Sequence, residues 1–118
     1  MTLFRAYLVF VLLGLAAYTL VVGAHHGWNL LPVFFGDIAA MTWPGQFNLD
    51  FLTFLGLSGL WVAWRHQFTP GGIALGLVAA VGGMLFLAPY LLWASARVGG
   101  DARALLLGTR RASAGAAG

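Results

Sequence analysis

The sequence predicts an all-α membrane protein with three transmembrane helices plus a short interfacial or re-entrant helix in the first connection. The chain of 118 residues is 61% hydrophobic and 8% charged, whereas an ordinary soluble domain is about 45–50% apolar and about 25% charged. Three long segments are almost free of charge, and arginines and aromatic residues flank them. A soluble chain of this size cannot cover so much apolar surface. The composition therefore argues against a soluble enzyme, a nucleic-acid-binding domain and a disordered chain.

The first predicted span covers residues 6–24, which include no charged side chain. At about 1.5 Å per residue, this segment measures about 28 Å, close to the thickness of a bilayer core. Arg5 and Tyr7 stand at its start, where a cation and an aromatic belt are expected. The segment is longer than the apolar part of a cleavable signal peptide, so we expect a retained membrane anchor.

The connection over residues 28–45 is predicted to form a short interfacial or re-entrant helix. Its apolar part, residues 30–41, is too short to cross a membrane and contains Pro32 and Asp37. Proline is favoured in the first turn of a helix. Trp28 and Trp43 are expected to hold the two ends of this segment at the level of the lipid headgroups.

The second and third spans, residues 47–64 and 73–96, are predicted to form an antiparallel helical hairpin. The segment between them contains Pro70-Gly71-Gly72, which is typical of a tight turn. Together the spans define a single transmembrane domain over residues 1–97. The remaining residues, 98–118, are predicted to form an arginine-bearing and partly disordered tail.

With three straight spans, the C-terminal tail and the 25–46 connection share one side of the membrane. The N-terminus and the 65–72 turn share the other side. Four of the six arginines then lie on the side of the tail, which favours a cytoplasmic C-terminus. Because the shortest loop contains Arg65 and short loops carry the most weight, the orientation stays open.

Asp50 and Arg97 are the candidate ion pair. In an antiparallel hairpin, the start of the second span meets the end of the third, so these two side chains are expected to lie close together. A carboxylate near a membrane is costly unless it is paired or hydrated. The alternative is that Asp50 is a functional acid that carries a proton.

His25 and His26 are candidate ligands for a hydrophobic cofactor, with Trp28 and Trp43 beside them. Imidazole is a common axial ligand of haem iron. The alternative is that the two histidines only end the first helix, where positive charge is favourable. No metal site is predicted, because the chain has no cysteine and no histidine spacing typical of a metal motif.

Small residues at four-residue spacing are expected to let the second and third spans pack closely, either within the chain or against a partner. Pro89 is expected to kink the third span. The small residues in these rows are Gly56, Gly59, Gly72, Gly76, Ala80 and Gly83.

Residues 28–97 also carry a set of short features seen in one known family. In order, these are residues 29–35, the helix entry at 48–51, the turn at 65–66, Gly82-Gly83 and residues 87–92. In these features the chain resembles the DUF2834 family of small bacterial membrane proteins. The resemblance implies that Asp50 corresponds to the acid of that family at the helix entry, and Pro89 to its proline near the end of the last helix. The family has no assigned activity, so the resemblance implies fold and location only.

We therefore expect a non-enzymatic accessory or scaffold subunit of a larger membrane complex, for example an energy-transducing one. Its partners would be the lipid bilayer and other subunits or further copies of the chain, but no nucleic acid. The expected location is the bacterial inner membrane. One alternative is a binder of quinone, carotenoid, chlorophyll or haem. Another is an enzyme or transporter component that uses Asp50 to handle protons.

Overall fold

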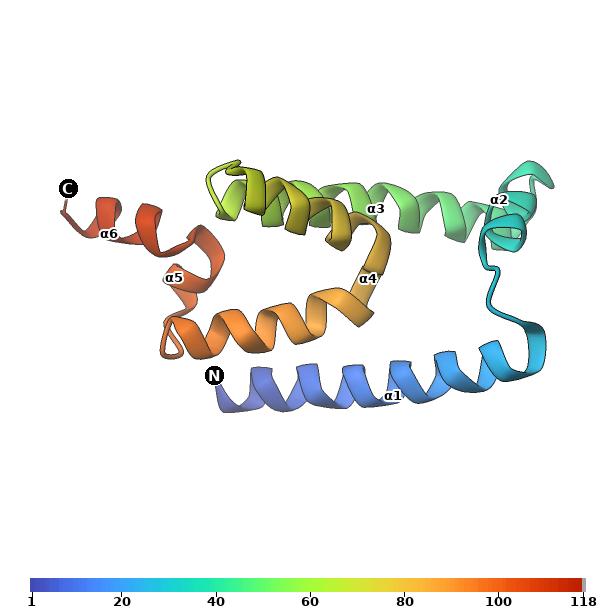
Figure 1. Ribbon diagram of the computed structural model, residues 1–118, viewed down its shortest axis with the longest axis horizontal. Coiled ribbons are helices and arrows are strands. Elements are labelled where there is room, and N and C mark those ends of the chain that lie inside the picture. The colour runs from blue at the N-terminus through green and yellow to red at the C-terminus, as the bar shows by residue number, and fades with distance from the viewer. Residues whose placement is uncertain (118) are drawn as a thin grey trace.

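The computed structural model describes residues 1–117, and helices dominate this part of the chain (Figure 1). The predicted all-α membrane class is confirmed, because three of the helices are long and apolar enough to cross a membrane. In chain order the helices are α1 (Thr2–His26), α2 (Leu31–Ala39), α3 (Trp43–Arg65), α4 (Pro70–Arg97), α5 (Ala102–Leu107) and α6 (Thr109–Ala117).

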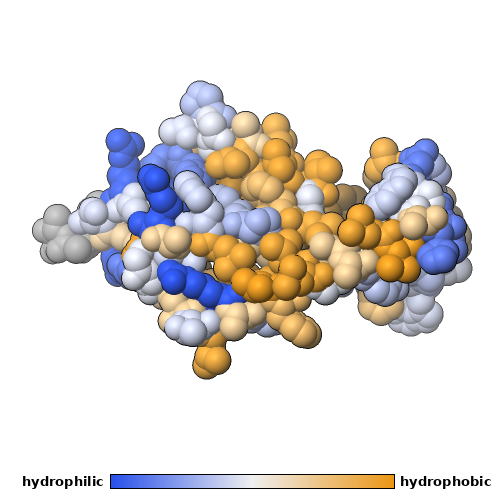
Figure 2. Space-filling model, turned by 60° about the horizontal axis from the view of Figure 1, so that its bottom comes forward, coloured by the Kyte–Doolittle hydropathy of each residue, from blue (hydrophilic) through white to orange (hydrophobic). Residues whose placement is uncertain are grey.

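Helices α1 and α3 run along the long axis of the molecule, with α4 packed between them (Figure 1). The molecule measures 52 × 26 × 24 Å. Hydrophobic side chains gather around its middle, while hydrophilic side chains gather at its two ends (Figure 2). This banding is typical of a protein whose long axis lies along the membrane normal.

Helix α4 is broken at Gly83 and doubles back on itself (Figure 1). Gly83 has φ 58° and ψ −144°, a conformation that is accessible to glycine because it lacks Cβ. The reversal brings Tyr90 back to the start of the helix, where its hydroxyl lies 2.7 Å from Nε2 of His66. In a straight helix, Tyr90 would lie about 30 Å from Pro70.

Each half of α4 is therefore too short to cross a bilayer. Residues 70–82 and 84–97 each span about 20 Å, against a hydrocarbon core of about 30 Å. A Cβ placed on Gly83 would lie 3.2 Å from Cζ of Phe51 and 3.6 Å from Cδ2 of Leu55. These two residues are near the middle of α3, so α4 turns back about half way along that helix.

The reversal changes the predicted position of the bend in the third span. The length and apolar composition expected of residues 73–96 are confirmed, but the sharp bend predicted at Pro89 lies at Gly83 instead. Pro89 continues the second half of α4 with helical dihedral angles. A glycine outside the helical region interrupts the hydrogen-bond ladder more completely than a proline, which removes one donor.

The start of α1, the α3–α4 turn and the helices α5 and α6 lie at the same end of the molecule (Figure 1). Arg5 of α1 donates from Nε to the hydroxyl of Ser95 at 3.0 Å, and Arg65 of α3 donates to the carbonyl of Leu105 at 2.6 Å. The prediction that the tail and the N-terminus lie on opposite sides is therefore wrong. It assumed a straight third span, and the break at Gly83 returns the chain to the side it came from.

Helix α3 packs closely against the first half of α4, as the spacing of small residues predicted. A Cβ on Gly59 would lie 2.6 Å from the carbonyl oxygen of Gly76 and 3.0 Å from Cβ of Ala80. Gly72 lies against His66 in the turn between the helices, whereas Gly56 faces open space. Four of the predicted small residues, Gly59, Gly72, Gly76 and Ala80, thus lie at close contacts. Gly83 is instead the residue at which α4 reverses.

The short helix predicted in the first connection is confirmed as α2, with Pro32 in its first turn. Gly45 lets the start of α3 approach the carbonyl of Asp37. The side-chain amide of Asn48 donates to the carbonyl of Phe34 at 3.1 Å. Helix α2 is therefore held against the start of α3, which begins at Trp43 rather than at residue 47.

The tail is more ordered than the sequence predicted. Helix α5 buries Ala104 and Leu105 against the rest of the chain. Its side-chain cap is Asp101, whose carboxylate accepts from the backbone N–H of Arg103 at 3.0 Å. Helix α6 follows where disorder was expected, and Gly118 lies outside the described residues.

Candidate functional site

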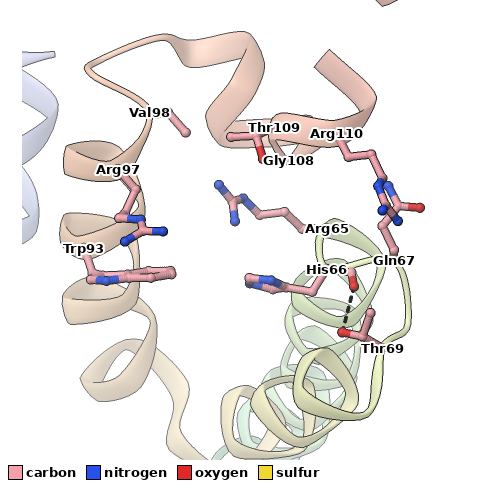
Figure 3. A pocket seen from close by; sticks show the side chains of 10 residues that line it. All are labelled: Arg65, His66, Gln67, Thr69, Trp93, Arg97, Val98, Gly108, Thr109 and Arg110. Atoms are coloured by element: carbon pink, nitrogen blue, oxygen red, sulfur yellow. Dashed lines mark hydrogen bonds between the residues drawn. The ribbon is translucent and has the colours of Figure 1, made fainter. Parts of the chain in front are cut away.

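A cationic cavity of about 550 Å³ opens at the end of the molecule where α3, α4 and α6 meet (Figure 3). We call this end of the molecule the arginine end. The core cluster of Val62, Ala79 and Tyr90 packs nearby. The residues that line the cavity are Arg65, His66, Gln67, Thr69, Trp93, Arg97, Val98, Gly108, Thr109 and Arg110.

Arg65 is the most deeply placed cation of this site, with only 7% of its surface exposed. Its Nε donates to the carbonyl of Leu105, and its Nη1 donates to the hydroxyl of Tyr90 at 3.3 Å. These partners are neutral, and the cavity lining includes no carboxylate. A buried charge is costly when no opposite charge accompanies it.

Arg97 faces Arg65 across the cavity, and both guanidinium groups point into it (Figure 3). The guanidinium carbon of Arg97 lies 5.5 Å from the centre of the Trp93 ring, within the range of a cation–π interaction. Two like charges directed at one space repel each other unless an anion lies between them. The geometry therefore favours a negatively charged occupant.

His66 lies at the bottom of the cavity, just beyond the end of α3. Burial and the neighbouring charge of Arg65 lower the pKa of His66 from its usual value of 6.5. Tyr90 accepts a hydrogen bond from Arg65, so its own proton is free to be donated to Nε2 of His66. This arrangement requires the neutral imidazole, in agreement with the lowered pKa.

Helix α6 closes one side of the cavity and is attached to the end of α3. Arg111 lies 4.0 Å above the centre of the Trp64 ring and donates to the carbonyl of Trp64. Gly108, with φ 83°, lets the chain pass directly against the backbone of Arg65. These contacts place Thr109 and Arg110 at the cavity.

All the arginines lie at this end of the molecule. Arg5 contacts Ser95 near the end of α4, and Arg103 lies on α5 beside Asp101. The other four are at the cavity or next to it. The opposite end carries His25, His26, Asp37 and Asp50, the last of these within the first turns of α3. The chain is therefore strongly asymmetric in charge along its long axis.

The residues predicted to hold a cofactor are only partly brought together. His26 and Trp28 line a cavity of about 470 Å³ at the end of α1, where the indole of Trp28 packs over Gly23. His25 is exposed outside that cavity, and Trp43 lines a different one with Met41. Among the described residues, no group of three or more histidine or acidic side chains is placed to hold a metal ion.

The predicted ion pair between Asp50 and Arg97 is wrong. Asp50 is exposed near the start of α3, whereas Arg97 lines the cavity at the opposite end of that helix, beside Arg65. Asp50 and Arg65 are separated by about 22 Å along the axis of α3. The pair was predicted for a straight third span, and the reversal at Gly83 carries Arg97 away.

The arginine-end cavity was missed because its parts are far apart in sequence. From the sequence alone, Arg65 and His66 were interpreted as the interfacial end of the second span. Arg97 was interpreted as the end of the third span. Only the reversal of α4 brings these ends together. The one sequence signal for it is the Gly82-Gly83 pair within an apolar run, since paired small residues are a common cause of sharp kinks.

No family model, no curated protein and no solved structure matches the chain. The resemblance to the DUF2834 family therefore stays a prediction.

Proposed function

We propose that this chain is a non-enzymatic accessory subunit of a larger complex in a bacterial cytoplasmic membrane. The observation that carries the proposal is the break at Gly83, about half way along α3. A break at this depth lies in the hydrocarbon core if α1 and α3 cross the bilayer. Such a break needs protein or water around it.

The backbone around the break lacks the partners that a continuous helix provides. Roughly four C=O groups at the end of one half have no donor within their helix, and roughly four N–H groups at the start of the other half have no acceptor. Val81, next to the break, is 87% exposed, and no described side chain hydrogen-bonds to residues 80–86. Because lipid cannot satisfy these groups, a neighbouring protein is the cover that we propose.

A groove beside the α3–α4 seam offers a surface for such a neighbour. It has a volume of about 280 Å³ and combines small and large apolar side chains. Gly56 lies in it with open space around its Cα. A groove floored by small residues lets another helix approach closely, which is the usual mode of helix association in membranes.

Asp50 supports the same proposal. It lies about 10 Å along the axis from the start of α3, and its side chain is exposed on a span-length apolar helix. In the described part of the chain, no group hydrogen-bonds to the carboxylate of Asp50, and the hydroxyl of Thr53 donates only to the backbone carbonyl of Asp50. A carboxylate at such a depth is expected to meet a partner's donor or cation.

The arrangement of charge supports one orientation. Cytoplasmic segments are enriched in arginine and lysine, and every arginine of this chain lies at the arginine end. We therefore propose that both termini and the α3–α4 turn face the cytoplasm, and that α2 faces the opposite side.

The test is native mass spectrometry of the protein extracted gently from its own membranes. A subunit carries a fixed mass increment from another polypeptide, and Gly56→Leu is expected to remove it by filling the groove. Gly14→Leu is the matched control, because Gly14 also faces open space but lies on α1. A monomer without any stoichiometric protein partner would refute the proposal.

A further inference from the structure

We propose that the arginine-end cavity binds a phosphoryl group between Arg65 and Arg97. Phosphate esters and inorganic phosphate share the chemistry that this site recognises, so the source is either a lipid headgroup at the membrane surface or a soluble phosphate. This inference does not depend on the chain being a subunit of a complex.

The composition of the cavity favours an oxyanion. Three guanidinium groups and no carboxylate line it. The planar fork of a guanidinium forms two parallel hydrogen bonds to phosphate, which an ammonium group cannot match. Gln67 and Thr109 add uncharged donors around the same space, whereas the hydroxyl of Thr69 already donates to the carbonyl of His66. A volume of about 550 Å³ has room for a phosphoryl group and part of what it is attached to.

Arg65 is held in place before any ligand arrives. The carbonyl of Leu105 and the hydroxyl of Tyr90 accept from its Nε and Nη1. These two bonds fix the guanidinium plane and leave its other N–H groups to point into the cavity toward Arg97 (Figure 3). A site whose side chains are already oriented loses little entropy when it binds. An anion would also supply the negative charge that this buried arginine lacks.

The site lies where a membrane surface is expected. Trp93 lines the cavity, and Trp64 lies beside it under Arg111. Tryptophan is enriched at the level of the lipid headgroups, and clusters of arginine next to a transmembrane helix attract anionic lipids. Phosphodiester headgroups are therefore within reach of the cavity, as are soluble phosphates from the aqueous side.

His66 links binding to pH. Its ring contacts Tyr90 of α4, and the charged groups that line the same cavity are Arg65 from α3, Arg97 from α4 and Arg110 from α6. A bound phosphoryl group would offset the charge of Arg65 and favour the imidazolium, so binding takes up a proton. Affinity for a phosphodiester, whose own charge does not change in this range, is then expected to increase as the pH falls from 7.5 to 6.

The experiment measures binding to the purified full chain in detergent by isothermal titration calorimetry. The probes are inorganic phosphate, dihexanoyl phosphatidylglycerol and, as the zwitterionic comparison, dihexanoyl phosphatidylcholine. We expect Arg97→Gln to weaken binding by about tenfold or more, because the substitution removes at least one charge-assisted hydrogen bond to the phosphoryl group. Arg97 is the residue of choice because it is exposed, so its replacement is not expected to unfold the chain.

Arg103→Gln is the matched control, since Arg103 lies at the same end on α5 but outside the cavity. Binding of phosphatidylglycerol without inorganic phosphate supports the site with a lipid source. Binding of inorganic phosphate supports it with a soluble source. The proposal is overturned if neither anion binds, or if Arg103→Gln weakens binding as much as Arg97→Gln.

Discussion

Gly59 and Gly76 determine how closely α3 and the first half of α4 approach. Each glycine faces the backbone carbonyl of the other, and Ala63 and Ala80 flank the contact. No larger side chain fits between the two helices without moving one of them. The seam between α3 and α4 therefore depends on these two positions more than on the large apolar residues around them.

Gly59→Ala is expected to destabilise the protein by about 1–3 kcal/mol, the usual cost of overpacking a close contact. The added methyl group would lie 2.6 Å from the carbonyl oxygen of Gly76. Gly56→Ala is the matched control on the same helix. It meets open space and should leave the stability unchanged or raise it by about 0.5–1 kcal/mol, since alanine is the better helix former. Equilibrium unfolding in mixed detergent measures both changes, and equal effects would contradict the close contact.

His66 is expected to make the folded state sensitive to acid. Its pKa is lower in the folded chain than its usual value of 6.5, so the unfolded chain takes up a proton first. The free energy of unfolding should be constant well above pH 6.5 and fall as the pH decreases below it. Thermal unfolding between pH 7.5 and 5.5 tests this, with His66→Gln as the comparison. A slope that persists unchanged in His66→Gln would assign it to other groups.

At single positions, the sequence predicted packing better than it predicted the site. The spacing of Gly59, Gly76 and Ala80 was enough to place them at a helix contact, because four-residue spacing puts side chains on one helical face. Arg65 and Arg97 carry no comparable local signal. Their proximity depends on a chain reversal between them, so each was interpreted only as the end of its own span.

At the scale of elements, Gly83 divides one apolar segment into two half-helices. The segment has the length and hydropathy of a span, and both halves stay apolar after the reversal. Hydropathy alone therefore cannot distinguish a straight helix from a re-entrant one. Helix α2 was predictable, by contrast, because its apolar run is short and Pro32 stands in its first turn.

Gly83→Ala is expected to destabilise the fold by about 1–3 kcal/mol. The dihedral angles of Gly83, φ 58° and ψ −144°, lie in a region where a side chain is strained. Gly71→Ala is the control in the same helix, because Gly71 faces open space and has no positive φ. Detergent unfolding of the two variants measures the difference. A Gly83→Ala protein as stable as Gly71→Ala would mean that α4 does not reverse there.

At the scale of the whole molecule, the reversal of α4 places all the arginines at one end. The arginines of α1, α3, α4, α5 and α6 meet at one end, while the histidine pair of α1 and two of the three acids lie toward the other. With straight spans the same arginines would be divided between the two sides of the membrane. The sequence contained the charges but not their grouping, because the grouping follows from the path of α4.

The most direct test of this path is the sidedness of single cysteines. The chain contains no cysteine, so Gln67→Cys, Ser113→Cys and Asn29→Cys each introduce the only thiol. A membrane-impermeant maleimide is applied to intact cells that produce each variant, with permeabilised cells as the control. We predict that Asn29→Cys reacts in intact cells, whereas Gln67→Cys and Ser113→Cys react only after permeabilisation. Labelling of Ser113→Cys and Gln67→Cys from opposite sides would show that α4 crosses the membrane, and would contradict the reversal on which both proposals depend.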